Sequence, residues 1–164
     1  MELGPYSVVH KGAIMTSKGR DPKVTHKIMS AIPSKNTEPE LMLRKALWKE
    51  NLRYRVNYKK LPGKPDIVFT KYHVVVFCDG DYWHGHNWAI RGLSSLEDEL
   101  TGYSEFWRSK ILRNIARDKE VNQELKAQGW TVIRLWESDI RSNLNECVRI
   151  VKEALSMVNT QEAY

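Results

Sequence analysis

The sequence predicts an α/β fold in which a small mixed sheet is flanked by helices. Two short apolar runs rich in β-branched residues, 66–69 and 74–78, follow each other closely along the chain, and a third strand-like run spans 130–136. The run 74–78 is continuously apolar, which is typical of a central strand covered on both faces. Helix-forming segments stand before and after these runs, so helices are expected to pack against the sheet.

Helices are expected at residues 37–51, 104–128 and 138–157. The first follows a capping residue, Asn36 or Thr37, and has Pro39 where an early helical proline is tolerated. The second ends at Gly129, and Ser138 is expected to cap the third. Four apolar side chains of the second helix are expected to face inward: Phe106, Ile111, Ile115 and Leu125.

The remaining segments complete the expected organisation. Alternating side chains predict a further strand at 53–58, and residues 82–103 are expected to form an irregular loop. Residues 1–36 are expected to form a basic N-terminal arm, residues 37–158 one folded domain, and residues 159–164 a C-terminal tail. Two interpretations of the arm stay open, a solvated terminus and an arm that embraces DNA.

Composition narrows the class of protein. The 164 residues suffice for one domain, and 26 basic against 20 acidic residues give a net charge of +6 that is compatible with nucleic-acid binding. Two cysteines, Cys78 and Cys147, form neither a disulfide framework nor a CxxC pair. With no apolar run of membrane-spanning or signal-peptide length, a cytoplasmic protein without membrane contact is expected.

Two carboxylates stand at the edges of adjacent predicted strands. Asp66 begins the run 66–69 and Asp79 follows the run 74–78. Antiparallel neighbours joined by a short turn would bring these residues together, and paired carboxylates suit Mg²⁺, which prefers oxygen ligands. The alternative is that each aspartate only marks the end of a strand.

The loop after the second run contains further candidates. His84 lies five residues beyond Asp79 and could transfer protons as a general base or acid, although a single histidine is more often an ordinary surface residue. Tyr82, Trp83 and Trp88 lie in the same loop. These aromatic side chains could pack onto the core, or they could stack on bases or insert between base pairs.

Three segments in order, LPGKPDIVF, VVVFCDGDYWHGH and EFWRSKILRNIARDKEVNQELKAQGWTVIRLWESDI, resemble the very-short-patch-repair (Vsr) endonuclease family. The resemblance covers roughly residues 25–155. It implies a variant of the PD-(D/E)xK, restriction-endonuclease-like fold with a mixed central sheet. The best known member of the family nicks DNA beside a T:G mismatch created by deamination of 5-methylcytosine.

The resemblance also implies roles for individual residues. Asp66 matches the metal-binding aspartate, and Cys78 matches the position whose backbone carbonyl also binds Mg²⁺. His84 matches the catalytic histidine, and Glu40 a helix glutamate near the active site. One or two Mg²⁺ ions are therefore the expected cofactor.

The aromatic pair Tyr82 and Trp83 matches side chains that wedge into the duplex at the mismatch. Further contacts to DNA phosphates or bases are expected from basic residues: Lys64, Arg91, Arg117, Lys110 and Arg113. Double-stranded DNA is the expected partner, and a companion DNA methylase or repair proteins are also possible.

The sequence departs from the family at two places. Asp79 stands where the motif has a second catalytic histidine, which predicts a metal site richer in carboxylates and leaves open whether Asp79 or His84 is the general base. The family's structural zinc site has three cysteines and a histidine, and only the histidine is present here, so no structural zinc is expected. The four positions are Asp81, His86, Trp88 and Ser138, and packing of Trp88 with Trp136 could replace the zinc.

Three functions are consistent with these observations. The first is a Mg²⁺-dependent endonuclease that nicks one strand at or near a T:G mismatch. The second is a restriction or strand-specific nicking endonuclease that acts on matched duplex DNA. The third is a DNA-binding module whose catalytic site has decayed, against which the presence of Asp66 and His84 argues.

Overall fold

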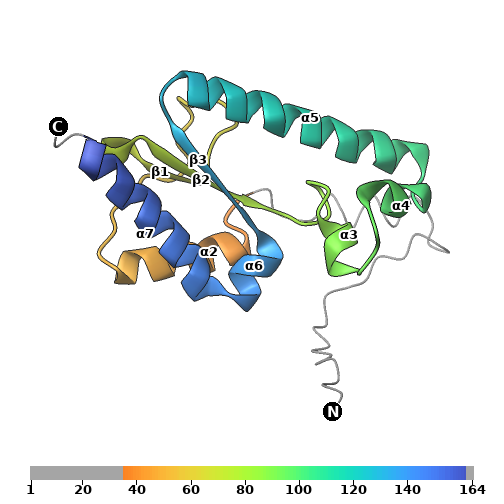
Figure 1. Ribbon diagram of the computed structural model, residues 1–164, viewed down its shortest axis with the longest axis horizontal. Coiled ribbons are helices and arrows are strands. Elements are labelled where there is room, and N and C mark those ends of the chain that lie inside the picture. Colours follow the sequence, from red (N-terminus) through yellow and green to blue (C-terminus); the bar gives the residue numbers. More distant parts are fainter. Residues whose placement is uncertain (1–34, 162–164) are drawn as a thin grey trace, which may run out of the picture. The chain divides into compact units, whose positions relative to one another are not determined.

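The computed structural model describes residues 35–161. Its elements are α2 (Glu38–Lys49), β1 (Ile67–Phe69), the 3-10 helix η1 (Thr70–Tyr72), β2 (Val74–Asp79), α3 (Asn87–Ile90), α4 (Leu96–Thr101), α5 (Glu105–Ala127), β3 (Thr131–Trp136), α6 (Glu137–Ser142) and α7 (Leu144–Gln161) (Figure 1). This mixed α/β architecture confirms the prediction. The expected arm lies outside the described residues except for its last two positions, and α7 continues into the expected tail. No helix in this part of the chain is long and apolar enough to cross a membrane.

The three strands form one sheet in the order β1-β2-β3. β1 and β2 are antiparallel, with Phe69 opposite Val74, and the short connection between them contains η1. β2 and β3 are parallel, with Val74 opposite Thr131 and Asp79 opposite Trp136. The apolar run therefore forms the central strand, as predicted.

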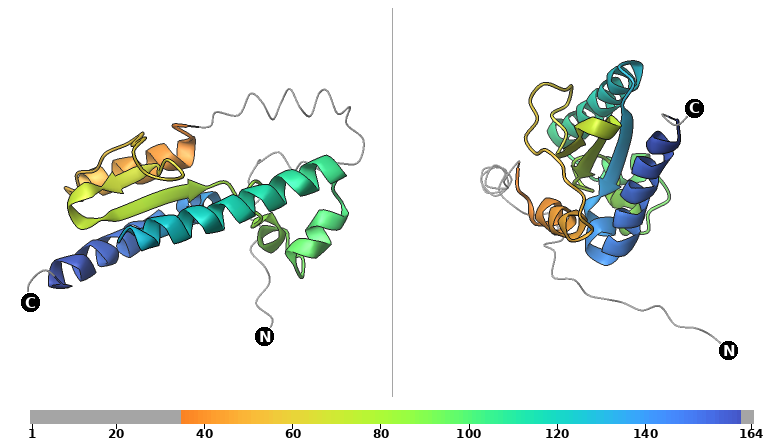
Figure 2. Two further views of the ribbon diagram at one scale, coloured as in Figure 1. Left: turned by 90° about the horizontal axis from the view of Figure 1, so that it is seen from above. Right: turned by 90° about the vertical axis from the view of Figure 1, so that its left-hand side faces the viewer.

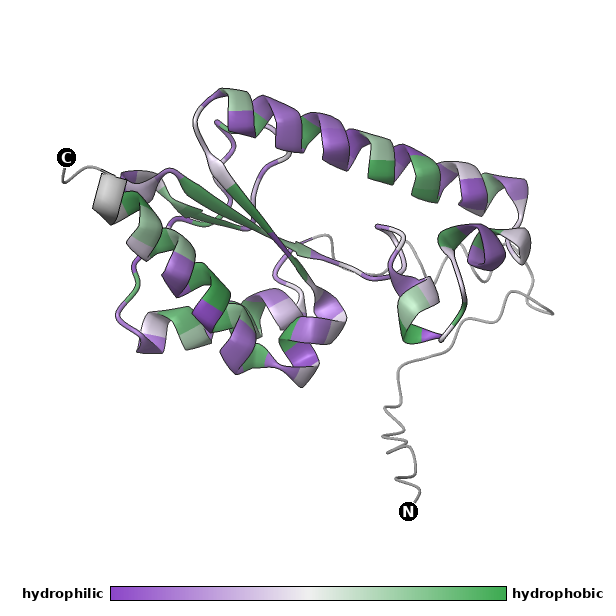
Figure 3. Ribbon diagram, in the orientation of Figure 1, coloured by the Kyte–Doolittle hydropathy of each residue, from purple (hydrophilic) through white to green (hydrophobic). Residues whose placement is uncertain are grey.

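Helices cover both faces of the sheet (Figures 1 and 2). On one face, Leu43 of α2 and Val151 of α7 share a core with Val76 of β2. On the other face, Leu125 of α5 packs with Val75. Successive residues of β2 point to opposite faces and so contribute to both cores. Burial on both sides explains why β1 and β2 are mostly hydrophobic in Figure 3, whereas the helices alternate.

The prediction of a strand at residues 53–58 is wrong. Only one isolated bridge forms in this segment, between Arg55 and Val68. Tyr54 packs against the core beneath α2 and α7, whereas Tyr58 packs against the core beneath α5. Between them Asn57 adopts a positive φ of 53°. This left-handed residue turns the backbone, so the two tyrosines reach opposite faces of the sheet although their spacing would place them on one face of a strand.

The expected irregular loop 82–103 contains two short helices, α3 and α4. Ser95 caps α4 by accepting a hydrogen bond from the backbone N–H of Asp98 at 3.2 Å. Leu100 anchors α4 with 4% of its surface exposed. A serine followed three residues later by an acidic residue is a helix-start pattern, which the loop prediction overlooked.

Two details of the later helices also differ from the prediction. Phe106 is 57% exposed, because the first turns of α5 extend beyond the sheet, and only Ile111 and Leu125 are fully buried on this helix. The expected single helix 138–157 is two helices, α6 and α7, which are separated at Asn143. Ser138 does not cap a helix but lies inside α6, where its side chain binds Asp81.

Candidate active site

Strand pairing places Asp66 next to the end of β2. The backbone N–H of Asp66 donates to the carbonyl of Val76 at 3.1 Å, and Asp66 Oδ2 accepts a hydrogen bond from the N–H of Cys78 at 2.7 Å. Cys78 immediately precedes Asp79, so the two aspartates lie at the same edge of the antiparallel pair. The geometric part of the prediction, that the turn would bring these strand edges together, is confirmed.

Glu40 lies beside Asp66 because the start of α2 packs against this edge. Glu40 is 3% exposed, and its carboxylate accepts hydrogen bonds from the hydroxyl of Thr37 at 3.0 Å and the N–H of Asn36 at 2.9 Å. Arg44, one turn later, donates to Glu40 at 3.1 Å and lies 3.5 Å from the backbone carbonyl of Asp66. We call Glu40, Arg44, Asp66 and the backbone of Cys78 the Asp66 cluster.

The surroundings of Asp66 fit a divalent cation. Burial, together with the charges of Glu40 and Asp79, raises its pKa to about 6 against the opposing effects of the Cys78 N–H and Arg44. Asp66 Oδ1 accepts no hydrogen bond from residues 35–161. A partly buried carboxylate with a free oxygen and two carboxylate neighbours is stabilised when a cation binds. Burial also raises the pKa of the Cys78 thiol, which leaves the backbone carbonyl as its donor to a cation at neutral pH.

This raised pKa predicts that Asp66 destabilises the metal-free protein at neutral pH. In the unfolded chain Asp66 ionises near pH 3.8, whereas in the fold it stays protonated up to about pH 6. The free energy of unfolding should therefore fall as the pH rises from about 4 to about 6, by roughly 2 kcal/mol. Asp66→Asn should unfold at a higher temperature than wild type at about pH 7.5 in EDTA, with a smaller difference at about pH 4. Thermal unfolding at both pH values tests this, and an equal difference at both would contradict it.

His84 lies in the loop after β2 and faces α5. Its Nδ1 forms a hydrogen bond with Asp118 Oδ2 and lies 3.8 Å from Asp79 Oδ1. Burial alone would raise the pKa of Asp118, but the hydrogen bond to His84 and the charges of His84, Arg134 and Arg117 lower it overall. An ionised carboxylate only accepts hydrogen bonds, so Nδ1 carries the hydrogen. In a neutral ring this leaves Nε2 free to accept a proton.

Arg134 of β3 completes this group of charges. Its NH1 donates to both carboxylate oxygens of Asp79 at 2.8 and 2.9 Å, and its NH2 lies 3.5 Å from Asp118. Donor atoms of Asp79, His84 and Asp118 all lie within 4.8 Å of one another, close enough to hold a metal ion. We call these four residues the His84 cluster. The prediction included Asp79 and His84 but missed Asp118 and Arg134.

Gly85 allows the loop to approach α5 closely. It adopts a φ of +76°, and a Cβ atom there would lie 2.6 Å from Cδ1 of Ile115. Nearby, the side chain of Asn114 donates to the carbonyl of Trp83 at 3.1 Å. Close packing and this hydrogen bond on either side of His84 together hold the loop to the helix.

Gly85→Ala should therefore displace His84 and reduce any activity that depends on it by roughly 10- to 100-fold. Gly92→Ala is a matched control, because Gly92 also has a positive φ of +67° but a Cβ there meets no atom within 4 Å. Both variants should lose about 1 kcal/mol of stability from backbone strain. Rates of that activity measured well below both melting temperatures distinguish them, and equal loss in the two variants would refute the role of close packing.

The aromatic residues of the loop pack against the start of α5. The rings of Tyr82 and Trp83 meet edge to face with centroids 5.0 Å apart, and Trp83 also contacts Trp107 at 5.6 Å. Lys110 Nζ lies 4.7 Å from the centre of the Trp83 ring. Tyr82 and Trp83 both remain partly exposed. The two rings thus pack against α5 on one side and are partly open to solvent, and Lys110 lies beside them.

The residues expected to contact DNA differ in how closely they adjoin the two clusters. Lys64 is exposed in the turn that leads to Asp66 and has a positive φ of 53°. The side chain of Arg117 is 60% exposed and lies 3.9 Å from Asp118, so it adjoins the His84 cluster. Arg91 lies at the end of α3 and 3.8 Å from Glu99. Arg117 therefore has the most direct connection to the candidate site.

The positions matched to the zinc ligands are joined by hydrogen bonds. Asp81 accepts from the Ser138 hydroxyl at 2.7 Å and the Ser138 N–H at 3.0 Å, and it lies 2.8 Å from Nδ1 of His86. The ring of His86 stacks on Trp136 with centroids 4.2 Å apart. Trp88 has no ring contact among the described residues, so the expected packing of Trp88 on Trp136 is wrong. Asp81 ties the loop after β2 to the start of α6.

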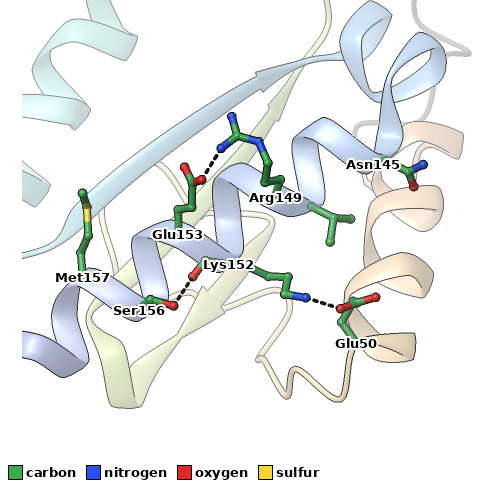
Figure 4. Close-up of a pocket in the computed structure, with 8 residues that line it drawn as sticks. Glu50, Asn145, Arg149, Lys152, Glu153, Ser156 and Met157 are labelled. Carbon is green, nitrogen blue, oxygen red and sulfur yellow. Dashed lines mark hydrogen bonds and ion pairs between the residues drawn. The ribbon is translucent and has the colours of Figure 1, made fainter.

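A groove lies elsewhere, between α2 and α7 (Figure 4). It has a volume of about 640 Å³ and is bordered by ion pairs between Lys152 and Glu50 and between Arg149 and Glu153. Glu50 follows the C-terminal end of α2, whereas Glu40 lies in its first turn. The groove is therefore separate from the Asp66 cluster.

Comparison with known proteins adds independent information. A family model described as DNA mismatch endonuclease Vsr matches residues 18–90. The chain is 46% identical over 134 residues to the type II nicking enzyme V.NmeDIP of Neisseria meningitidis serogroup C, a match that covers 82% of this chain and 87% of the relative.

Two further relatives show the same pattern. The type II nicking enzyme V.HpaIIP of Haemophilus parainfluenzae is 42% identical over 110 residues, which are 67% of this chain and 74% of the relative. The DNA mismatch endonuclease Vsr of Escherichia coli (strain K12) is 33% identical over 121 residues, which are 74% of each chain. The similarity thus extends over most of the length of these proteins.

Proposed function

Since this chain belongs to the Vsr family, whose members are DNA endonucleases, we propose that it cuts one strand of duplex DNA with a divalent metal ion as cofactor. It is an endonuclease rather than the decayed binding module considered as an alternative. We assign its α/β domain to the restriction-endonuclease-like folds, because Asp66 stands at the edge of a mixed sheet beside the helix residue Glu40. The observation that carries the proposal is the Asp66 cluster adjacent to the His84 cluster.

Asp66 and the backbone carbonyl of Cys78 would hold Mg²⁺, which when bound would polarise the scissile phosphate and stabilise its developing negative charge. Glu40 differs from Asp66, because both of its oxygens already accept hydrogen bonds. We propose that Glu40 holds Arg44 in place and contributes negative charge near the cation. Asp79 is also occupied, by Arg134, and its role is considered below.

His84 is the better candidate for the general base. Asp118 orients its ring and leaves Nε2 free to take the proton of a water molecule whose oxygen attacks phosphorus. The bond from phosphorus to the leaving sugar oxygen then breaks, and that oxygen is protonated by solvent. Asp79 is less suited to this task because Arg134 neutralises its charge.

The exposed surface around these clusters fits a duplex. We propose that Tyr82 and Trp83 insert beside the target base pair, because they are partly exposed and braced by Trp107 and by each other. Lys64, Arg91 and Arg117, together with Lys110 and Arg113, would contact DNA phosphates or bases.

The substrate is proposed to be a T:G mismatch, in keeping with the family description. A second candidate is matched duplex DNA, favoured by the relatives that are named type II nicking enzymes and by the altered positions Asp79 and Asp81. Nicking enzymes of this kind would act beside a companion DNA methylase or repair proteins. Action on cellular DNA is the reason to propose a cytoplasmic location.

A cleavage assay with both strands labelled tests the proposal. One duplex carries a T:G mismatch in varied flanking sequence, its control is fully paired, and each is incubated with Mg²⁺ or with EDTA. Metal-dependent nicking of the T strand in the mismatched duplex alone would support mismatch repair. Equal cutting of both duplexes would favour the matched-duplex function, and cutting in EDTA would refute the metal requirement.

A further inference from the structure

We propose that Arg134 is a built-in cation that occupies the His84 cluster, keeps divalent metal ions out of it, and holds Asp79 and Asp118 beside His84. The metal ion is thereby confined to the Asp66 cluster. In this arrangement Arg134 is a positioning residue and Asp79 is not a metal ligand. The assignment of the remaining metal to Asp66 rests on the proposed function, whereas the exclusion from the His84 cluster does not.

The geometry shows competition for the same atoms. Asp79, His84 and Asp118 offer ligand atoms within 4.8 Å of one another, an arrangement that could hold a divalent ion. Arg134 already faces two of these three residues, since its NH1 contacts both oxygens of Asp79 at 2.8 and 2.9 Å and its NH2 lies 3.5 Å from Asp118. An ion at this place would meet a guanidinium group that keeps its positive charge at every relevant pH.

Arg134 is held in place by contacts with α5 and β2. Its Nε donates to the side chain of Asn122 on α5 at 2.9 Å. The guanidinium lies 4.2 Å from the centre of the ring of Phe77, which is its partner in the register of β2 and β3. Its side chain is 18% exposed. Moving the guanidinium aside to admit an ion would break these contacts together.

The balance of charges leads to the same inference. Two carboxylates face His84, and Arg134 supplies one permanent positive charge between them. Without Arg134 the cluster would present two carboxylates to one histidine, with the exposed Arg117 3.9 Å from Asp118, which is a favourable setting for a divalent ion. At Asp66 the nearest cation is Arg44, which is paired with Glu40 and reaches only the backbone carbonyl of Asp66. The two clusters therefore differ in which carboxylate the arginine binds: Arg134 binds Asp79 itself, whereas Arg44 does not reach the carboxylate of Asp66.

The test is a titration of the purified protein with Mn²⁺, without DNA, by isothermal calorimetry or equilibrium dialysis. Arg134→Gln should gain a Mn²⁺-binding event that is absent in wild type. The Mn²⁺ affinity of the His84 cluster should rise by at least ten-fold. This event should disappear in Arg134→Gln/Asp79→Asn and persist in Arg134→Gln/Asp66→Asn. Arg134→Lys, which keeps the charge, should not gain it. Arg149→Gln is the matched control, because Arg149 also pairs with two carboxylates but lies on the exposed face of α7.

A second measurement avoids any change at Arg134. Asp79→Asn alone should leave the number of bound Mn²⁺ ions unchanged, whereas it would remove an ion if Asp79 were a ligand. The proposal is overturned if Asp79→Asn lowers the number of bound ions, or if folded Arg134→Gln gains no Mn²⁺ binding that depends on Asp79. Because no cleavage is measured, failure of the proposed nicking activity would leave this result interpretable.

Discussion

Replacing Asp66 with asparagine is expected to reduce the rate of DNA nicking by about a thousand-fold or more. Asparagine keeps the shape of the side chain and an oxygen for the Cys78 N–H, but it removes the negative charge beside Glu40 and Asp79. A metal ion that polarises a phosphate contributes several kcal/mol to transition-state stabilisation, and about 4 kcal/mol corresponds to a factor of a thousand. The effect should be on catalysis rather than on DNA binding, since Asp66 is largely buried and its side-chain hydrogen bond goes to the Cys78 N–H within the protein.

Single-turnover nicking with enzyme in excess, combined with DNA binding measured in EDTA, checks this expectation. Binding should change by no more than about three-fold. Asp139→Asn serves as the control, because Asp139 is an exposed aspartate of α6 outside both clusters. Nicking by Asp66→Asn within about ten-fold of wild type would rule out Asp66 as the metal ligand.

The second large effect is expected at His84. His84→Gln should lower the nicking rate by roughly 100- to 10,000-fold, the usual contribution of a positioned proton-transfer group. Asp118→Asn should have a smaller effect of about ten-fold, because it weakens the orientation of the ring but leaves Nε2 in place. This order of effects distinguishes a base from a residue that only supports the loop.

The measurement is again the single-turnover rate, with Tm recorded for each variant. His73→Gln is a suitable control, since His73 is exposed at the turn before β2 and packs on Trp130 outside the His84 cluster. A nicking rate of His84→Gln close to that of wild type would remove His84 from the mechanism. A larger loss in Asp118→Asn than in His84→Gln would reverse the assigned roles.

The sequence was sufficient for the features that depend on local pattern. The apolar run of β2 predicted a central strand, and the short turn before it predicted that Asp66 and Asp79 would meet. The histidine and the aromatic pair of loop 80–86 could be predicted as site residues because they come directly after the end of a buried strand. In each case the relevant residues are separated by only a few positions or by one tight turn.

The features that were missed depend on long-range packing. Asp118 stands within a run of charged residues on a long helix, where most acidic side chains face solvent, and only the approach of Gly85 to Ile115 brings it to His84. In the sequence, Arg134 is a single polar residue in a predicted strand. Its position beside Phe77 and Asp79 depends on the parallel register of β2 and β3. The false strand at 53–58 had the opposite cause, since a single left-handed residue overrode a correct alternation.

The parallel pairing of β2 with β3 also sets the order in which the His84 cluster assembles. Asp79 and Arg134 are 55 residues apart, and the catalytic loop and α5 lie between them. Closing so long a stretch of chain is slow compared with forming the β1–β2 pair, so β3 joins the sheet after that pair exists. A chain that ends before β3 thus has Asp79 and His84 but not the arginine that binds Asp79, so the His84 cluster is complete only once the last strand has docked.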